Sequence, residues 1–180
     1  VKGPGRELFD RIEQKLGKLN LIAEDLGIIT PEVEQLRDDL ELPGMKIIQF
    51  AFDFDPNNAY LAHNYPSTNC VVYAGTHDNN TVNGWYYGGE VNEHQKSYIA
   101  GYLGCDNDHE MNWKIIRYAM GSVAYLSIVA AQDILGYGKE FRMNTPGIAF
   151  GNWRWKLKKG ALDGALVHRL GEMTRMFNRA

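Results

Sequence analysis

The chain has 180 residues, of which 44% are hydrophobic and 23% are charged, values typical of one soluble globular domain. Its formal net charge is -3, so it lacks the basic surplus that characterises most proteins that bind nucleic acids. No stretch reaches about 18 consecutive apolar residues, the length that a transmembrane helix needs. We therefore expect neither a nucleic-acid partner nor a membrane partner.

The cysteines and histidines argue against a disulfide scaffold and a zinc site. Cys70 and Cys105 are too few for the dense cross-links of small secreted domains, no CxxC pair occurs, and the five histidines are scattered. We expect two reduced thiols, no structural metal and a cytosolic type of compartment. The N-terminal residues do not form a secretory signal, and the missing initiator Met suggests a piece of a longer chain.

In chain order, segments with helical spacing of apolar residues alternate with short continuous apolar runs. Apolar spacing and helix-start signals predict helices over residues 5–16, 32–40, 93–103, 110–120 and 162–177. Continuous apolar runs, typical of strands buried on both faces, occur at residues 19–23, 45–52, 70–75 and 125–131. Strands that alternate with helices indicate an α/β fold with a parallel sheet and crossover helices, in one domain or part of one.

Ionisable side chains follow two of the predicted strands. Glu24 and Asp25 come directly after the first apolar run, and His77 and Asp78 follow the third. Because active sites of parallel α/β folds lie at the carboxyl ends of the strands, the two clusters together indicate such a site. For either cluster alone, an ion pair or a helix cap is the alternative.

Two carboxylates at one site suit glycosidic chemistry, in which one protonates the leaving oxygen and another attacks or stabilises the sugar. Aromatic residues that can stack on sugar rings occur after the second cluster and near the end of the chain. Core packing is the alternative for each of them. They are Trp85, Tyr86, Tyr87, Trp153 and Trp155.

Four long blocks occur in order along the chain: LIAEDLGIITPEV, PGMKIIQFAF, VVYAGTHDNNTVNGW and RMNTPGIAFGNWRW. Together they resemble the amylomaltase or disproportionating-enzyme family, the 4-alpha-glucanotransferases of glycoside hydrolase family 77 in the alpha-amylase clan. The resemblance implies transfer of a 1,4-alpha-glucan segment from a maltooligosaccharide donor to the 4-hydroxyl of glucose or another glucan. It further implies a retaining double displacement, no metal or organic cofactor, and a cytoplasmic or plastid location.

Carried over by motif, the resemblance implies roles for five residues. Glu24 would be the general acid/base, and Asp78 the aspartate that stabilises the transition state. His77, Asp25 and Asn144 would contact the sugar. For Asp25, helix capping or a supporting role behind the site is the alternative, and for Asn144 a place in a turn.

The family's nucleophile, an Asp in an Arg-x-Asp-His type of motif at the end of barrel strand four, does not occur in this sequence. By that alignment the predicted strands are strands 5–8 of a TIM (β/α)8 barrel, and residues 1–180 form its C-terminal part without the N-terminal half. The chain alone is then expected to be inactive, and its open sheet edges to favour self-association or pairing with the missing half. The alternatives are a non-catalytic alpha-glucan-binding module and an alpha-amylase-type hydrolase with water as the acceptor.

Overall fold

A sheet of three parallel strands forms the centre of the computed structural model, which describes residues 3–105 and 107–179. The strands are β1 (Gly44–Ile47), β2 (Cys70–Tyr73) and β3 (Leu126–Ile128), in the spatial order β1-β2-β3. This arrangement confirms the predicted α/β fold with a parallel sheet. Each strand is shorter than the apolar run that predicts it, since the chain after β1 turns at once into a 3-10 helix, Ile48–Phe50.

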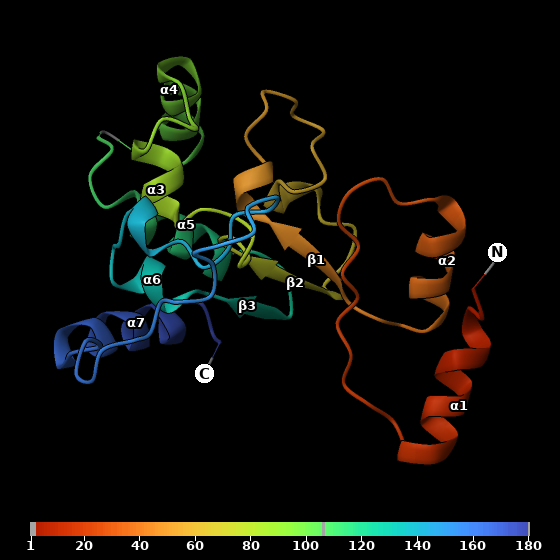
Figure 1. Cartoon of the computed structure of the whole chain (residues 1–180). Coiled ribbons are helices and arrows are strands. Elements are labelled where there is room, and N and C mark those ends of the chain that lie inside the picture. The colour runs from red at the N-terminus through yellow and green to blue at the C-terminus, as the bar shows by residue number, and fades with distance from the viewer. Residues whose placement is uncertain (1–2, 106, 180) are drawn as a thin grey trace.

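In Figure 1 the first two helices lie to the right of this sheet and the others to its left. Five of them match predicted helices within a few residues: α1 (Arg6–Leu16), α2 (Pro31–Asp39), α4 (Glu93–Tyr102), α5 (Met111–Met120) and α7 (Gly164–Met176). Two short helices, α3 (Val82–Tyr87) and α6 (Ala131–Ile134), lie outside the predicted ones because so few residues show no helical spacing. Single 3-10 turns occur at Ala62–Asn64 and Lys139–Phe141.

The main core lies between one face of the sheet and the helices α3 and α5. Val72 of β2 is fully buried there, together with Ile115 and Ala119 of α5. The ring of Phe52 adds an aromatic group to this core and lies 5.7–6.3 Å, between centroids, from three others, those of Trp85, Tyr102 and Tyr118. This packing fixes the positions of β1 and β2, and with them the loops that leave their carboxyl ends.

The predicted strand at residues 19–23 is wrong. This stretch makes one backbone–backbone hydrogen bond to the chain around the sheet, from the Ala23 N–H to the Pro43 carbonyl (2.9 Å), and forms no ladder. The N–H of Met45, the next donor on β1, donates instead to the side chain of Asp25 (2.7 Å). A parallel ladder needs evenly spaced backbone bonds, so the side-chain bond takes the place of its next rung.

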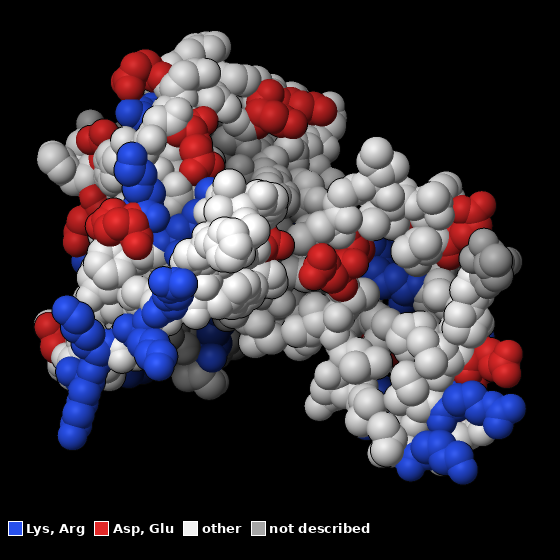
Figure 2. Space-filling model, viewed as in Figure 1, with Lys and Arg blue, Asp and Glu red and all other residues white. Residues whose placement is uncertain are grey.

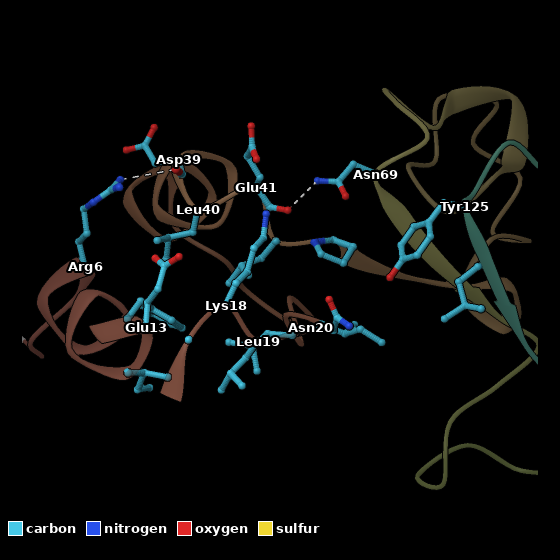
Figure 3. Close-up of a pocket in the computed structure, with 18 residues that line it drawn as sticks. Arg6, Glu13, Lys18, Leu19, Asn20, Asp39, Leu40, Glu41, Asn69 and Tyr125 are labelled. Carbon is cyan, nitrogen blue, oxygen red and sulfur yellow. Dashed lines mark hydrogen bonds between the residues drawn. The ribbon is translucent and has the colours of Figure 1, made fainter. Parts of the chain in front are cut away.

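The two N-terminal helices are set off from the main body. None of the residues within α1 or α2 is buried, and Figure 2 shows an indentation between this part and the rest of the molecule. A groove of about 700 Å³ separates α1 and the following residues from Tyr125 and Leu126 (Figure 3). Leu126 and Ile128 of β3 are each 38% exposed. The sheet face opposite the helical core is therefore only partly covered.

Both cysteines, Cys70 and Cys105, are free thiols, as the sequence predicts. Burial raises the pKa of the Cys70 thiol, which favours its protonated form. Among the described residues, no helix is long and apolar enough to cross a membrane.

Candidate active site

A cleft of about 500 Å³ opens at the carboxyl ends of the strands. It brings together three of the residues singled out in the sequence, Glu24, His77 and Asp78, although more than fifty residues separate Glu24 from the other two. Other side chains complete the lining, including those of Ile22, Leu26, Met45, Tyr73, Asp133, Arg142 and Trp153. The cleft therefore lies at one end of a parallel sheet, where active sites of such folds lie.

The loop after β2 presents His77 and Asp78 through a tight turn. The backbone N–H and the hydroxyl of Thr76 both donate to Asn79 Oδ1 (2.9 Å each), and the Asp78 N–H donates to Thr76 Oγ1 (3.2 Å). Short polar side chains that bond the nearby backbone stabilise such turns. The turn leaves the side chains of His77 and Asp78 half exposed on the cleft.

Asn144 contacts both residues of this turn. Its Nδ2 donates to Asp78 Oδ1 (2.5 Å), and its backbone N–H donates to the His77 carbonyl (3.1 Å). Arg142 donates to the Asp78 carbonyl (2.5 Å) and to the Asn144 carbonyl (2.8 Å), and so joins the two segments. These bonds orient the Asp78 carboxylate, whose Oδ2 lies 3.4 Å from His77 Nε2.

Of the aromatic residues singled out in the sequence, Trp153 lines the cleft. Its ring lies 5.0 Å from that of His77, its side chain is largely exposed, and its φ of 61° is strained for a non-glycine residue. Trp155, two residues on, packs instead edge-on against Tyr137. Trp85 and Tyr86 are buried in the core. Trp153 therefore offers the cleft a free aromatic face.

Asp25 does not line the cleft. Side chains on its two sides, those of Ile22, Glu24 and Leu26, line it at alternate positions, whereas the Asp25 carboxylate is bonded elsewhere. Its Oδ2 accepts from Arg37 Nη1 (2.6 Å), and its Oδ1 accepts from the Met45 N–H (2.7 Å). The Asp25 side chain is about 10% exposed, whereas Glu24 is an exposed residue. The structure thus keeps Asp25 behind the site.

Asp133 is a site residue that the sequence analysis misses. It follows β3, is 2% exposed, and accepts a hydrogen bond from the Val82 N–H (2.7 Å) in the first turn of α3. Burial raises its pKa to about 6, although the bond from Val82 opposes the shift. The signal was available, since Asp133 is a carboxylate just beyond a predicted strand, as Asp78 is. Its bond anchors the helix that follows the His77–Asp78 turn.

A metal centre has no candidate in the part of the chain that the structure describes. No group of three or more His, Cys, Asp or Glu side chains there is placed to hold a metal ion. The side chains of the cleft offer three carboxylates, an imidazole, and amide and guanidinium donors. This set suits proton transfer and the stabilisation of positive charge on a sugar.

Comparison with known sequences points the same way. The chain matches the family model described as 4-alpha-glucanotransferase over residues 1–162. It is 46% identical to a 4-alpha-glucanotransferase of Synechocystis sp., over 98% of this chain and 35% of the relative. It is 45% identical to one of Thermus thermophilus, over 97% and 36%. A potato relative, described as chloroplastic/amyloplastic, is 47% identical over 86% and 26%.

Solved structures agree with these matches. The chain superposes with a TM-score of 0.92 on an amylomaltase from Streptococcus agalactiae in complex with acarbose, at 36% identity over 100% of this chain and 36% of that one. An amylomaltase from Corynebacterium glutamicum gives a TM-score of 0.66 at 18% identity, a likeness of fold alone. The chain spans about a third of the length of these relatives.

Proposed function

The chain belongs to the 4-alpha-glucanotransferase family, and we propose that it forms the C-terminal part of the catalytic barrel of such an enzyme. The whole enzyme would move a 1,4-alpha-glucan segment from a maltooligosaccharide to the 4-hydroxyl of glucose or another glucan. The observation that carries the proposal is the cleft that holds Glu24, His77 and Asp78 together, with Asn144 bonded to Asp78.

Glu24 is the general acid/base in this proposal. It protonates the glycosidic oxygen as the bond to the leaving glucan breaks, while an aspartate outside this chain takes the glucosyl segment in a covalent bond. Glu24 then removes the proton from the acceptor 4-hydroxyl as that oxygen displaces the aspartate. In retaining enzymes the two carboxyl groups lie about 5–5.5 Å apart. Glu24 is exposed in this chain, and we propose that the rest of the enzyme covers it.

Asp78 stabilises the positive charge that develops on the sugar ring. Asn144 donates to Asp78 Oδ1, and Asp78 Oδ2 lies beside His77. The side chains of Asp78 and His77 both line the cleft. A fixed carboxylate that need not reorient during the reaction is an effective electrostatic catalyst. His77 and Asn144 also offer hydrogen-bond partners to sugar hydroxyls, and Trp153 offers a flat face on which a glucosyl ring can stack.

The sheet supports the view that these are barrel strands. Three parallel strands cannot close, and a complete (β/α)8 barrel takes about 250 residues. The exposed Leu126 and Ile128 and the groove of Figure 3 lie on the face that the other strands of a barrel would cover. We propose a cytoplasmic location, or a plastid one as in the potato relative.

A complementation assay tests the proposal. Glucose release from maltotriose is measured for this chain alone, for the upstream part of the enzyme alone, and for the two mixed. We expect no release from either part and release from the mixture, because the acid and the nucleophile then share one site. Activity of this chain alone would contradict the proposal, since another carboxylate here would have to be the nucleophile.

Two other activities are outcomes of the same assay. Glucose released from maltotriose without any longer glucan product would indicate a hydrolase, in which water replaces the glucan acceptor. No release from the mixture or from the full-length enzyme, with retained binding of maltooligosaccharide, would indicate a glucan-binding module.

A further inference from the structure

The Asp25 carboxylate ties together three segments that meet behind the cleft. It lies on the extended stretch that carries Glu24, and it accepts one hydrogen bond from the Arg37 guanidinium on α2 and another from the Met45 N–H on β1. Both distances, 2.6 and 2.7 Å, are those of strong charge-assisted bonds. The low exposure of the Asp25 side chain, about 10%, shields them from water.

Backbone hydrogen bonds add little to this anchoring. In the described chain, residues 18–29 make one backbone–backbone hydrogen bond, that of Ala23 to the Pro43 carbonyl. Ile22, Glu24 and Leu26 line the cleft, whereas the Asp25 carboxylate between them bonds Arg37 and Met45. Glu24 therefore enters the cleft as its neighbour Asp25 turns away from it, and the anchoring of Asp25 sets where Glu24 lies.

Gly44 lies directly against the anchored carboxylate. A Cβ atom at this position would collide with Asp25 Oδ2. Any other residue at position 44 would push the carboxylate off Arg37 and Met45. The close approach of the Asp25 carboxylate thus requires glycine at position 44, the first residue of β1.

We infer that Asp25 is a positioning residue that holds Glu24 in the geometry required for proton transfer, and that it does so through Arg37, Met45 and Gly44. The inference rests on the proposed function, because it takes Glu24 as the acid. It replaces the direct sugar contact that the family resemblance implies for Asp25. A positioning role acts on the steps in which Glu24 moves a proton and spares substrate binding.

The test uses the full-length enzyme that contains this chain, with two donors that differ in leaving group. Maltotriose needs protonation of its leaving oxygen, whereas the fluoride of alpha-maltotriosyl fluoride departs with little help from an acid. For Asp25→Asn we expect kcat on maltotriose to fall about 10- to 100-fold with KM within about twofold. We expect the first-turnover release of fluoride to stay within about twofold of the wild-type rate.

Asp38→Asn is the matched control. Asp38 bonds the same Arg37 guanidinium (2.7 Å), but its side chain is 61% exposed, whereas that of Asp25 is about 10% exposed. We expect both donors to react at the wild-type rate. Gly44→Ala is a second route to the same carboxylate, which it displaces without removing its charge. We expect it to match Asp25→Asn, and the double variant to be no worse than either single one.

The outcomes separate this inference from the proposed function. An equal loss on both donors would make Asp25 a merely structural residue, and a raised KM with unchanged kcat would make it a sugar ligand. Either result overturns the inference. Glu24→Gln serves as the reference, because it should slow maltotriose far more than fluoride release. If Glu24→Gln shows no such difference, the proposed function fails. If Glu24→Gln shows this difference between the two donors, but Asp25→Asn and Gly44→Ala do not, the inference alone fails.

Discussion

The two proposed catalytic carboxylates are held by regions of opposite construction. Asp78 lies on a turn between β2 and α3, above a core of fully buried aliphatic side chains, and its neighbours bond it from several directions. Glu24 lies on a stretch that forms no ladder, beside two helices without a buried residue. A packed core and a set of hydrogen bonds therefore position Asp78, whereas a single polar anchor and the rest of the enzyme must position Glu24.

The largest effect in the well-packed region is expected from Asp78→Asn. The amide keeps the size of the carboxylate and loses the negative charge that opposes the charge on the sugar. We expect kcat of the full-length enzyme to fall about 100- to 1,000-fold, in line with the loss of a preorganised electrostatic group. Steady-state kinetics with maltotriose checks this. Asn144→Ala keeps the Asp78 charge and removes one hydrogen bond that orients it, so we expect a smaller loss of kcat than for Asp78→Asn. A larger loss for Asn144→Ala would contradict the assignment of Asp78 as the stabilising group.

A smaller effect is expected where the cleft meets the C-terminal loop. Trp153→Ala removes the exposed ring beside His77, and an aromatic contact of about 0.5–1.5 kcal/mol corresponds to a rise in KM of about 2- to 10-fold. Trp155→Phe is the control, since that ring packs on Tyr137 away from the cleft. Initial rates over a range of maltotriose concentrations distinguish the two. A greater rise for Trp155→Phe would argue against Trp153 as the sugar platform.

The smallest effect on turnover, and a distinct effect on stability, is expected from Asp133→Asn. Burial raises the pKa of Asp133 to about 6 from an ordinary value of 3.8, so the folded state binds its proton more tightly than the unfolded state does. The contribution of this group to stability is therefore full below pH 4 and is lost as the pH rises to 6, by roughly 3 kcal/mol. The amide does not ionise and can still accept from Val82.

Urea unfolding of the full-length enzyme at several pH values checks this linkage. Relative to wild type, Asp133→Asn should gain stability between pH 4 and pH 6 and hold the gain above that range. Lys159→Gln, a change at an exposed site, should follow the wild-type curve. A constant offset between Asp133→Asn and wild type at all pH values would show that Asp133 does not carry the raised pKa.

Much of the fold could be predicted from local pattern. The spacing of apolar residues predicts five helices and the three parallel strands, because it reports whether a segment is amphipathic or buried on both faces. The stretch 19–23 reads as a strand by the same rule and is none, because a distant side-chain bond, Asp25 to the Met45 N–H, replaces the ladder. Competition of this kind between side chain and backbone leaves no mark on hydrophobic spacing.

The site divides in the same way. The strand-end rule leads us to expect Glu24, His77 and Asp78 at one site, and the three residues line one cleft, although the stretch before Glu24 forms no strand. Asn144 came from family resemblance, and its bond to Asp78 spans 66 residues of sequence, beyond the reach of any local pattern. The rule also does not predict that the Asp25 side chain points away from the cleft, because that orientation depends on the position of Arg37 on a separate helix.

The most direct test of the account is the activity of Glu24→Gln in the full-length enzyme, measured as glucose release from maltotriose across pH. We expect kcat to fall roughly 10²- to 10⁴-fold with little change in maltotriose binding, because the glutamine cannot exchange the proton. Folding is checked by comparing its urea unfolding with that of the wild type. Turnover within about twofold of the wild type would contradict the account, and would require another side chain to protonate the glycosidic oxygen.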